Sequence, residues 1–235
     1  MSLYLLDDRP VFPDPANADE DGLVAVGGDL TVERLLAAYL NGIFPWFIEE
    51  GLIFWFSPDP RMVLFPDKLK IPDSLQRRMK KGDYKVTVDH YFSEVITHCS
   101  KVPRPDDKGT WISKEFIESY TALHKAGFAH SVEVLQDGHL TGGLYGVSIG
   151  AAFFGESMFH LQPDSSKIAL VHLVERLRTM NFLFIDCQVE TRHFYNLGAE
   201  LISRKKYLEL LKKATEHKNV KSSWLPLRGS SDAQK

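Results

Sequence analysis

The sequence predicts an α+β fold with two parts, a small N-terminal domain and a larger C-terminal domain with one mixed, mostly antiparallel sheet. The chain has 235 residues, of which 44% are hydrophobic, and this content suffices for one large core or two modest ones. Helical and strand-like patterns alternate regularly only after about residue 110. We therefore assign residues 1–62 and 63–109 to the N-terminal domain and residues 110–235 to the C-terminal domain.

The composition argues against several classes of protein. The net charge of −3 does not suit a surface that coats nucleic acid throughout, although it allows a local basic patch. Two cysteines, Cys99 and Cys187, are too few for a disulfide framework and suit a reducing cytoplasm. The nine histidines form no HExxH motif or Cys/His cluster, so we expect no metal site. Without a signal-peptide pattern or a segment long enough to span a bilayer, the protein is expected to be cytoplasmic, with no membrane partner.

Two aromatic segments follow a predicted helix over residues 32–40 in the N-terminal domain. They read GIFPWF at 42–47 and LIFWFSPDPR at 52–61, and their prolines favour irregular backbone over long strands. Most of these rings should belong to the core. Because rings on rigid loops also form stacking surfaces for bases, both interpretations stay open for Trp46.

A basic stretch follows, in which seven lysines and arginines but only three aspartates fall between residues 67 and 85. A helix that starts after Pro72 would place four of them around its last turn, where they complement the helix dipole. These four are Arg77, Arg78, Lys80 and Lys81. A solvated basic face is the default interpretation, but contact with a phosphate backbone is a plausible alternative.

The C-terminal domain shows a regular order of elements. In sequence these are a helix at 114–125, a strand at 130–136, two strands within 140–159 joined at 148–150, a helix at 165–180, a strand at 183–189, a helix at 191–197, a strand at 200–203 and a helix at 207–214. This order is that of an acetyltransferase-like (GNAT) domain. An acetyl-CoA enzyme usually has a Gly- and Arg-rich turn before its long helix, to hold pyrophosphate. Here that position reads HLQPDSSK, so the sequence allows the fold without the cofactor.

Two carboxylates in this domain, Glu156 and Asp186, stand among uncharged neighbours. An acid in such surroundings is costly to bury unless a partner pairs with it. One such acid is most simply explained by a hydrogen bond to a loop. Strand alternation places Asp186 and Gln188 on one face and Cys187 on the other, toward the core. Two acids with a glutamine beside one of them favour a functional site.

Eight short strings occur together in this chain. They are GGDL at 27–30, GIFPWF at 42–47, FSPDPR at 56–61, GTWI at 109–112, YGV at 145–147, FGESMF at 154–159, DSSKIAL at 164–170 and IDCQV at 185–189. With these strings the sequence resembles the bacterial leucyl/phenylalanyl-tRNA–protein transferases over nearly its whole length. The resemblance implies an aminoacyltransferase that moves Leu, Phe or Met from aminoacyl-tRNA to the α-amine of proteins with N-terminal Arg or Lys. Such proteins are then marked for N-end rule degradation. It also implies no CoA, metal or other cofactor, and a monomer is expected.

The chemistry requires a neutral amine near the ester carbonyl and stabilisation of the charge that develops during attack. We expect Asp186 to bind and orient this amine or to take its proton, with Gln188 hydrogen-bonding beside it. Glu156 would either hold the basic side chain of the acceptor or orient its amine. The sequence offers no Ser-His or Cys-His pair for a covalent intermediate, so direct transfer is the simpler mechanism.

The resemblance also implies which residues meet the rest of the substrate. An apolar pocket for the aminoacyl side chain would consist of Leu144, Phe153, Leu170, Leu173 and Ile185. The terminal adenosine would stack on aromatic residues, with Trp46, Trp111, Tyr39 and Tyr120 as candidates. Arg77, Arg78, Lys80 and Lys81 would follow the tRNA backbone. Two alternatives are an acetyltransferase that uses acetyl-CoA and a non-catalytic RNA-binding module.

Overall fold

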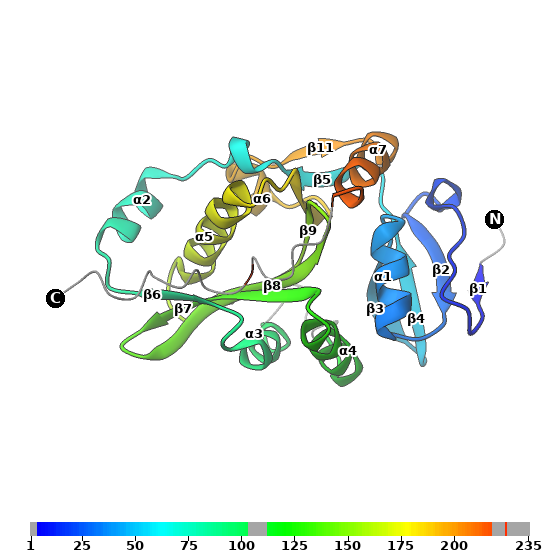
Figure 1. Cartoon of the computed structure of the whole chain (residues 1–235), viewed down its shortest axis with the longest axis horizontal. Helices are drawn as coiled ribbons and strands as arrows, with labels where there is room; N and C mark the ends of the chain where they lie inside the picture. The colour runs from blue at the N-terminus through cyan, green and yellow to red at the C-terminus, as the bar shows by residue number, and fades with distance from the viewer. Residues whose placement is uncertain (1–3, 103–111, 218–223, 225–235) are drawn as a thin grey trace.

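The computed structural model describes residues 4–102, 112–217 and 224, and Figure 1 shows two sheets of unequal size. The smaller sheet and its helix come from β1 (Leu5–Leu6), the 3-10 helix η1 (Pro15–Asn17), β2 (Leu23–Gly27), α1 (Val32–Leu40), β3 (Phe44–Glu49) and β4 (Leu52–Phe56). Its strand order is β1-β2-β4-β3, so β3 is an edge strand. In Figure 1 this edge is the one nearest the larger sheet.

The GGDL string marks a close approach of backbone to a buried arginine. Thr31 caps the predicted helix α1, since its side chain accepts a hydrogen bond from the backbone N–H of Arg34. The Arg34 guanidinium is fully buried and donates to the backbone oxygens of Asp7 and Arg9 at 2.7 and 2.9 Å. A Cβ at Gly28 would lie 3.0 Å from this guanidinium, and the φ of +71° also favours glycine there. Arg34 thereby fastens the N-terminal arm to the small domain.

The prediction of irregular backbone around the aromatic segments is wrong, because they form a hairpin. Strands β3 and β4 pair antiparallel, and Glu50 and Gly51 make the turn with φ of 50° and 79°. Pro45 is compatible with β3 because an edge strand has one side without a ladder partner, and the register shifts just after it. Trp55 is fully buried, and its indole N–H donates to the Gly27 oxygen at 2.9 Å.

The larger unit contains the remaining elements. They are β5 (Arg61–Leu64), η2 (Pro66–Lys68), α2 (Asp73–Lys80), β6 (Lys85–Val88), α3 (Phe92–Cys99), α4 (Lys114–Lys125), β7 (Ala129–Gln136), β8 (His139–Ile149), β9 (Ala152–His160), α5 (Ser165–Thr179), β10 (Phe184–Gln188), α6 (Arg192–Asn196), β11 (Glu200–Ile202) and α7 (Arg204–Thr215). Their strand order is β11-β5-β10-β9-β8-β7-β6, with β9 and β10 parallel and the other pairs antiparallel. The predicted mixed, mostly antiparallel sheet and the predicted order of elements after residue 110 are confirmed.

Sheet membership does not follow the predicted division of the chain at residue 109. Strand β5 lies between β10 and β11, and β6 pairs with β7, so both belong to the larger sheet. The change from one sheet to the other falls in residues 57–60, which connect β4 to β5. The predicted boundary itself lies in residues 103–111, outside the described residues. Long-range strand pairing of this kind leaves no mark in local composition.

Helices cover both faces of the larger sheet. Figure 1 shows α5 on one face and α3 and α4 on the other. One core cluster, which includes Phe116 and Tyr145, continues into the small domain, and a second lies under α5. Among the described residues, no helix is long and apolar enough to cross a membrane.

Candidate active site

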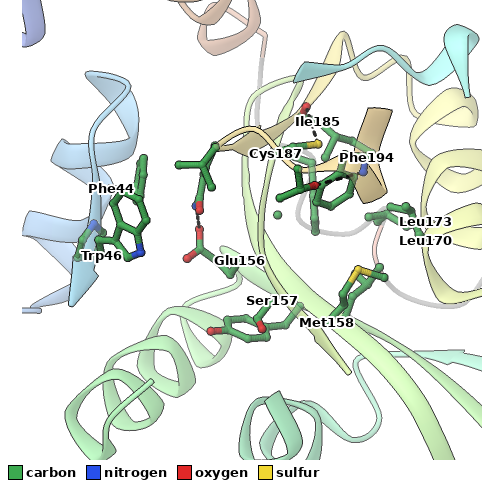
Figure 2. A pocket seen from close by; sticks show the side chains of 18 residues that line it. Phe44, Trp46, Glu156, Ser157, Met158, Leu170, Leu173, Ile185, Cys187 and Phe194 are labelled. Carbon is green, nitrogen blue, oxygen red and sulfur yellow. Dashed lines mark hydrogen bonds between the residues drawn. The ribbon is translucent and has the colours of Figure 1, made fainter. Parts of the chain in front are cut away.

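The parallel strands β9 and β10 pair over only three residues each and then separate. The pairs run from Phe184 with Ala152 to Asp186 with Phe154, whereas β9 continues to His160. A pocket with a cavity volume of about 230 Å³ opens where the strands part. It extends from the edge strand β3 to helix α5, and Figure 2 shows Glu156 between these two ends.

The end of the pocket near α5 is apolar. It is lined by all five residues that were predicted to form an apolar pocket, namely Leu144, Phe153, Leu170, Leu173 and Ile185. The sequence did not point to Met158 and Phe194, which line the same end. Since these residues come from β8, β9, α5, β10 and α6, only the folded sheet brings them together. A cavity with this lining suits an apolar side chain.

Glu156 is almost fully buried, and three side chains donate hydrogen bonds to it. The hydroxyl of Tyr39 and the Nε2 amide of Gln188 reach Oε1 at 2.8 and 2.9 Å, and the hydroxyl of Tyr120 reaches Oε2 at 3.0 Å. Burial raises the pKa of Glu156 to about 7, against the lowering effect of the tyrosine hydroxyls. A carboxyl group with such a pKa can accept or release a proton near neutral pH.

The predicted stacking role of Tyr39 and Tyr120 is wrong, because both rings are fully buried. Their hydroxyl groups contact each other as well as Glu156. Burial also raises the pKa of both tyrosines well above its usual value, so they stay protonated as donors to the carboxylate. The two hydroxyl groups therefore hold Glu156 in place.

Asp186 is fully buried and pairs with Arg61, which no pattern in the sequence predicted as its partner. Arg61 donates from Nε and Nη2 to the two carboxylate oxygens at 2.9 and 2.7 Å, and the hydroxyl of Tyr207 donates to Oδ2 at 2.7 Å. Burial acts to lower the pKa of Arg61, but the Asp186 charge outweighs it and the pKa is raised. A buried aspartate needs a partner, so a basic residue was to be expected near it. The signal in the sequence that pointed to Arg61 was its place in the FSPDPR string.

The predicted shared strand face of Asp186 and Gln188 is wrong, because a bulge lies between them. The register with β5 shifts there, and Gln188 adopts a φ of 63°, which is uncommon for a residue with a side chain. The backbone N–H of Gln188 donates to Asp186 Oδ1 at 2.9 Å, while its side chain lines the pocket and reaches Glu156. Among the described residues, Asp186 is not one of those that line the pocket.

Cys187 is buried, as expected, and also lines the pocket. Burial raises the pKa of its thiol well above the usual value. A thiol that resists ionisation is a poor nucleophile. Cys187 is therefore a poor candidate for a covalent intermediate.

The remaining predicted residues lie in different places. Trp46 is half-buried, lines the β3 end of the pocket with Phe44 and packs edge-on against Phe56 at 4.9 Å. Trp111 lies outside the described residues. Of the four basic residues, Arg78 pairs with Asp83, whereas the other three are exposed on or next to α2, namely Arg77, Lys80 and Lys81. Within the described residues, no three His, Cys, Asp or Glu side chains gather closely enough to hold a metal ion.

Comparison with known proteins shows to which class of protein this chain belongs. The family model described as "Leucyl/phenylalanyl-tRNA protein transferase" matches residues 63–212, and the model of its N-terminal domain matches residues 28–59. The fold, the pocket and these matches define an aminoacyltransferase. The chain belongs to the leucyl/phenylalanyl-tRNA protein transferase family. The resemblance seen in the sequence is thereby confirmed.

Individual relatives agree with the family match. The leucyl/phenylalanyl-tRNA–protein transferase of Myxococcus xanthus (strain DK1622) is 54% identical over 226 residues, which cover 95% of this chain and 97% of that protein. The protein of the same name from Maridesulfovibrio salexigens is 49% identical over 97% of this chain and 96% of its own. Among solved structures, L-PGS from Bacillus licheniformis aligns with a TM-score of 0.40 and 11% identity, over 80% of this chain and 64% of its own.

Proposed function

We propose that this protein transfers leucine, phenylalanine or methionine from aminoacyl-tRNA to the α-amine of proteins that begin with Arg or Lys, which marks them for N-end rule degradation. The observation that carries this proposal is the apolar pocket directly beside the hydrogen-bonded pair Glu156 and Gln188. A pocket of this kind discriminates a single methylene by only about 1–3 kcal/mol, so β-branched side chains must be rejected by shape. Because aminoacyl-tRNA is a substrate of translation, the site of action is the cytoplasm.

The proposal assigns each part of the substrate to a part of the pocket. The aminoacyl side chain enters the apolar end under α5, and the ester carbonyl lies near Glu156 and Gln188. At the opposite end Trp46 provides the stacking surface for the terminal adenosine, an interaction of about 1–3 kcal/mol. The exposed basic residues of α2 follow the tRNA backbone and do not read its sequence.

Gln188 and Glu156 carry the proton chemistry. Since the Gln188 Nε2 group donates to Glu156, its Oε1 atom can accept a hydrogen bond from the incoming amine. The amine nitrogen then attacks the ester carbonyl carbon, and the carbon–nitrogen bond forms as the bond to the tRNA ribose oxygen breaks. Glu156 takes the proton that the nitrogen loses and returns it to the leaving ribose oxygen. The ester is already activated, so transfer needs no ATP.

Asp186 acts on the reaction through Gln188. Its two carboxylate oxygens are occupied by Arg61, Tyr207 and the Gln188 backbone, which leaves it no room for the amine. The hydrogen bond from the Gln188 N–H stabilises the left-handed backbone that turns this side chain into the pocket. Asp186 and Arg61 are therefore positioning residues.

Radiolabelled Leu-tRNA, incubated with a protein that begins with Arg, tests the proposal. We expect label in acid-insoluble material after RNA hydrolysis, and much less with an otherwise identical protein that begins with Asp. An enzyme that uses acetyl-CoA would instead bind CoA by calorimetry without competition from tRNA. Binding of Leu-tRNA without peptide product would identify a non-catalytic RNA-binding module and overturn the proposal.

A further inference from the structure

Trp224 lies beyond the last helix of the described chain, yet it is buried in the same apolar cluster as all five predicted pocket residues. Only 3% of its surface is exposed. Its ring centroid lies 5.7 Å from that of Phe153, which lines the pocket. Phe153 therefore has the pocket on one side and Trp224 on another.

Side chains from several elements hold the Trp224 ring in place. His130 of β7 stacks on it with centroids 4.1 Å apart and an angle of 7°, and Asp89 fixes this imidazole through Nδ1 at 2.8 Å. The Arg176 guanidinium of α5 lies 5.7 Å from the centroid of the indole, and the Phe182 ring stands perpendicular to it with centroids 6.3 Å apart. A ring held on several sides acts as a rigid wall.

Helix α5 links this wall to the pocket a second time. Leu170, Leu173 and Arg176 are spaced three residues apart, so they follow one another along the same side of the helix. The first two line the pocket and the third contacts Trp224. The tryptophan thus supports the apolar end of the pocket both from behind Phe153 and from the next turn of α5.

We propose that Trp224 is a specificity-determining residue, which closes the apolar end of the pocket behind Phe153 and fixes how large an aminoacyl side chain can enter. The proposal rests on the proposed aminoacyl transfer. Trp224 touches no substrate and acts by positioning Phe153. Without the indole, the Phe153 ring can move back into the vacated space, because a cavity of that size is partly filled by its neighbours. The pocket then becomes deeper and less defined.

The test compares kcat/KM for aminoacyl-adenosine esters of leucine, phenylalanine and 2-naphthylalanine. For Trp224→Ala we expect the ratio of naphthylalanine to phenylalanine to rise by about tenfold or more, since one misfitting methylene already changes such a ratio by about 10–200-fold. The KM for leucine should rise while kcat changes little. Trp224→Phe keeps a ring behind Phe153 and should return both values most of the way to wild type.

Leu75→Ala is the matched control, because Leu75 of α2 is buried in the same cluster and, among the described residues, does not line the pocket. It should lower stability without a change in selectivity. If Trp224→Ala does not fold, Trp224→Leu replaces it in the test, because leucine also removes the ring but with a smaller loss of volume. A folded Trp224→Ala or Trp224→Leu variant with wild-type selectivity would overturn the inference. Failure of the wild-type protein to transfer any residue would instead refute the proposed function.

Discussion

Replacement of Asp186 by Asn keeps the shape of the side chain but leaves Arg61 without its negative partner. Both side chains are at most 1% exposed, so water cannot take over the solvation of the guanidinium. An uncompensated buried charge of this kind costs about 3–5 kcal/mol. For a chain of 235 residues, each kcal/mol lowers Tm by roughly 2–4 °C, so we expect Asp186→Asn to melt about 6–20 °C below wild type.

The matched control removes both charges. In Arg61→Met with Asp186→Asn, the methionine still packs against Phe44 and Tyr207, and the asparagine oxygen can still accept from the Gln188 N–H. We expect the double variant to recover about 1–3 kcal/mol relative to Asp186→Asn alone. The loss in the single variant is then due to the unpaired charge and not to the changed shape.

Circular dichroism melts and urea titrations measure these differences. Activity is measured below the melting range and expressed per folded molecule. There kcat of Asp186→Asn should fall by about 10²-fold, because the unpaired Arg61 guanidinium displaces the bulge that holds the Gln188 side chain in the pocket. An Asp186→Asn protein whose free energy of unfolding lies within about 1 kcal/mol of the wild-type value would show that Arg61 and Asp186 do not form a buried ion pair.

Three further predictions concern the pocket and the tRNA contacts. Because the pKa of Glu156 is about 7, the carboxylate that accepts the proton is lost as the pH falls through 7. Below pH 7, kcat/KM should therefore drop about tenfold more per pH unit than protonation of the acceptor amine alone causes, and Glu156→Gln should lower kcat and leave only the dependence due to the amine. Trp46→Ala should raise the KM for aminoacyl-tRNA by about tenfold or more in a normally melting protein; unchanged kinetics would exclude stacking. Charge reversal at Arg77, Lys80 and Lys81 should weaken tRNA binding and flatten its salt dependence, yet leave aminoacyl-adenosine transfer unchanged; equal loss on both substrates would point to stability instead.

Local patterns in the sequence were sufficient to predict most helices and strands of the C-terminal domain. The helix at 114–125 and the strands near 130–136 and 183–189 have clear periodicity, and the structure confirms them within a residue or so. The hairpin of β3 and β4 was missed because Pro45 weakens the strand pattern, and only the edge position in the sheet makes it acceptable. Strand β5 was missed because four residues that end at Leu64 carry too little periodicity.

The candidate site was predicted unevenly for a physical reason. The pocket residues follow from the family resemblance, and the structure places them together. The partners of the two acids could not be predicted, because Arg61 lies 125 residues from Asp186 and Tyr39 lies 117 residues from Glu156. The bulge at Gln188 could not be predicted either, because strict alternation assigns side chains to faces only where the register is regular.

A crystal structure with the amide analogue of phenylalanyl-adenosine tests the central claim most directly. We expect the phenylalanine ring at the apolar end of the pocket, between Leu144, Phe153 and Leu173, with the carbonyl carbon within reach of Gln188 Oε1 and the adenine against Trp46. A phenylalanine ring bound elsewhere, or a carbonyl group remote from Gln188 and Glu156, would contradict the assignment of this pocket as the site of transfer.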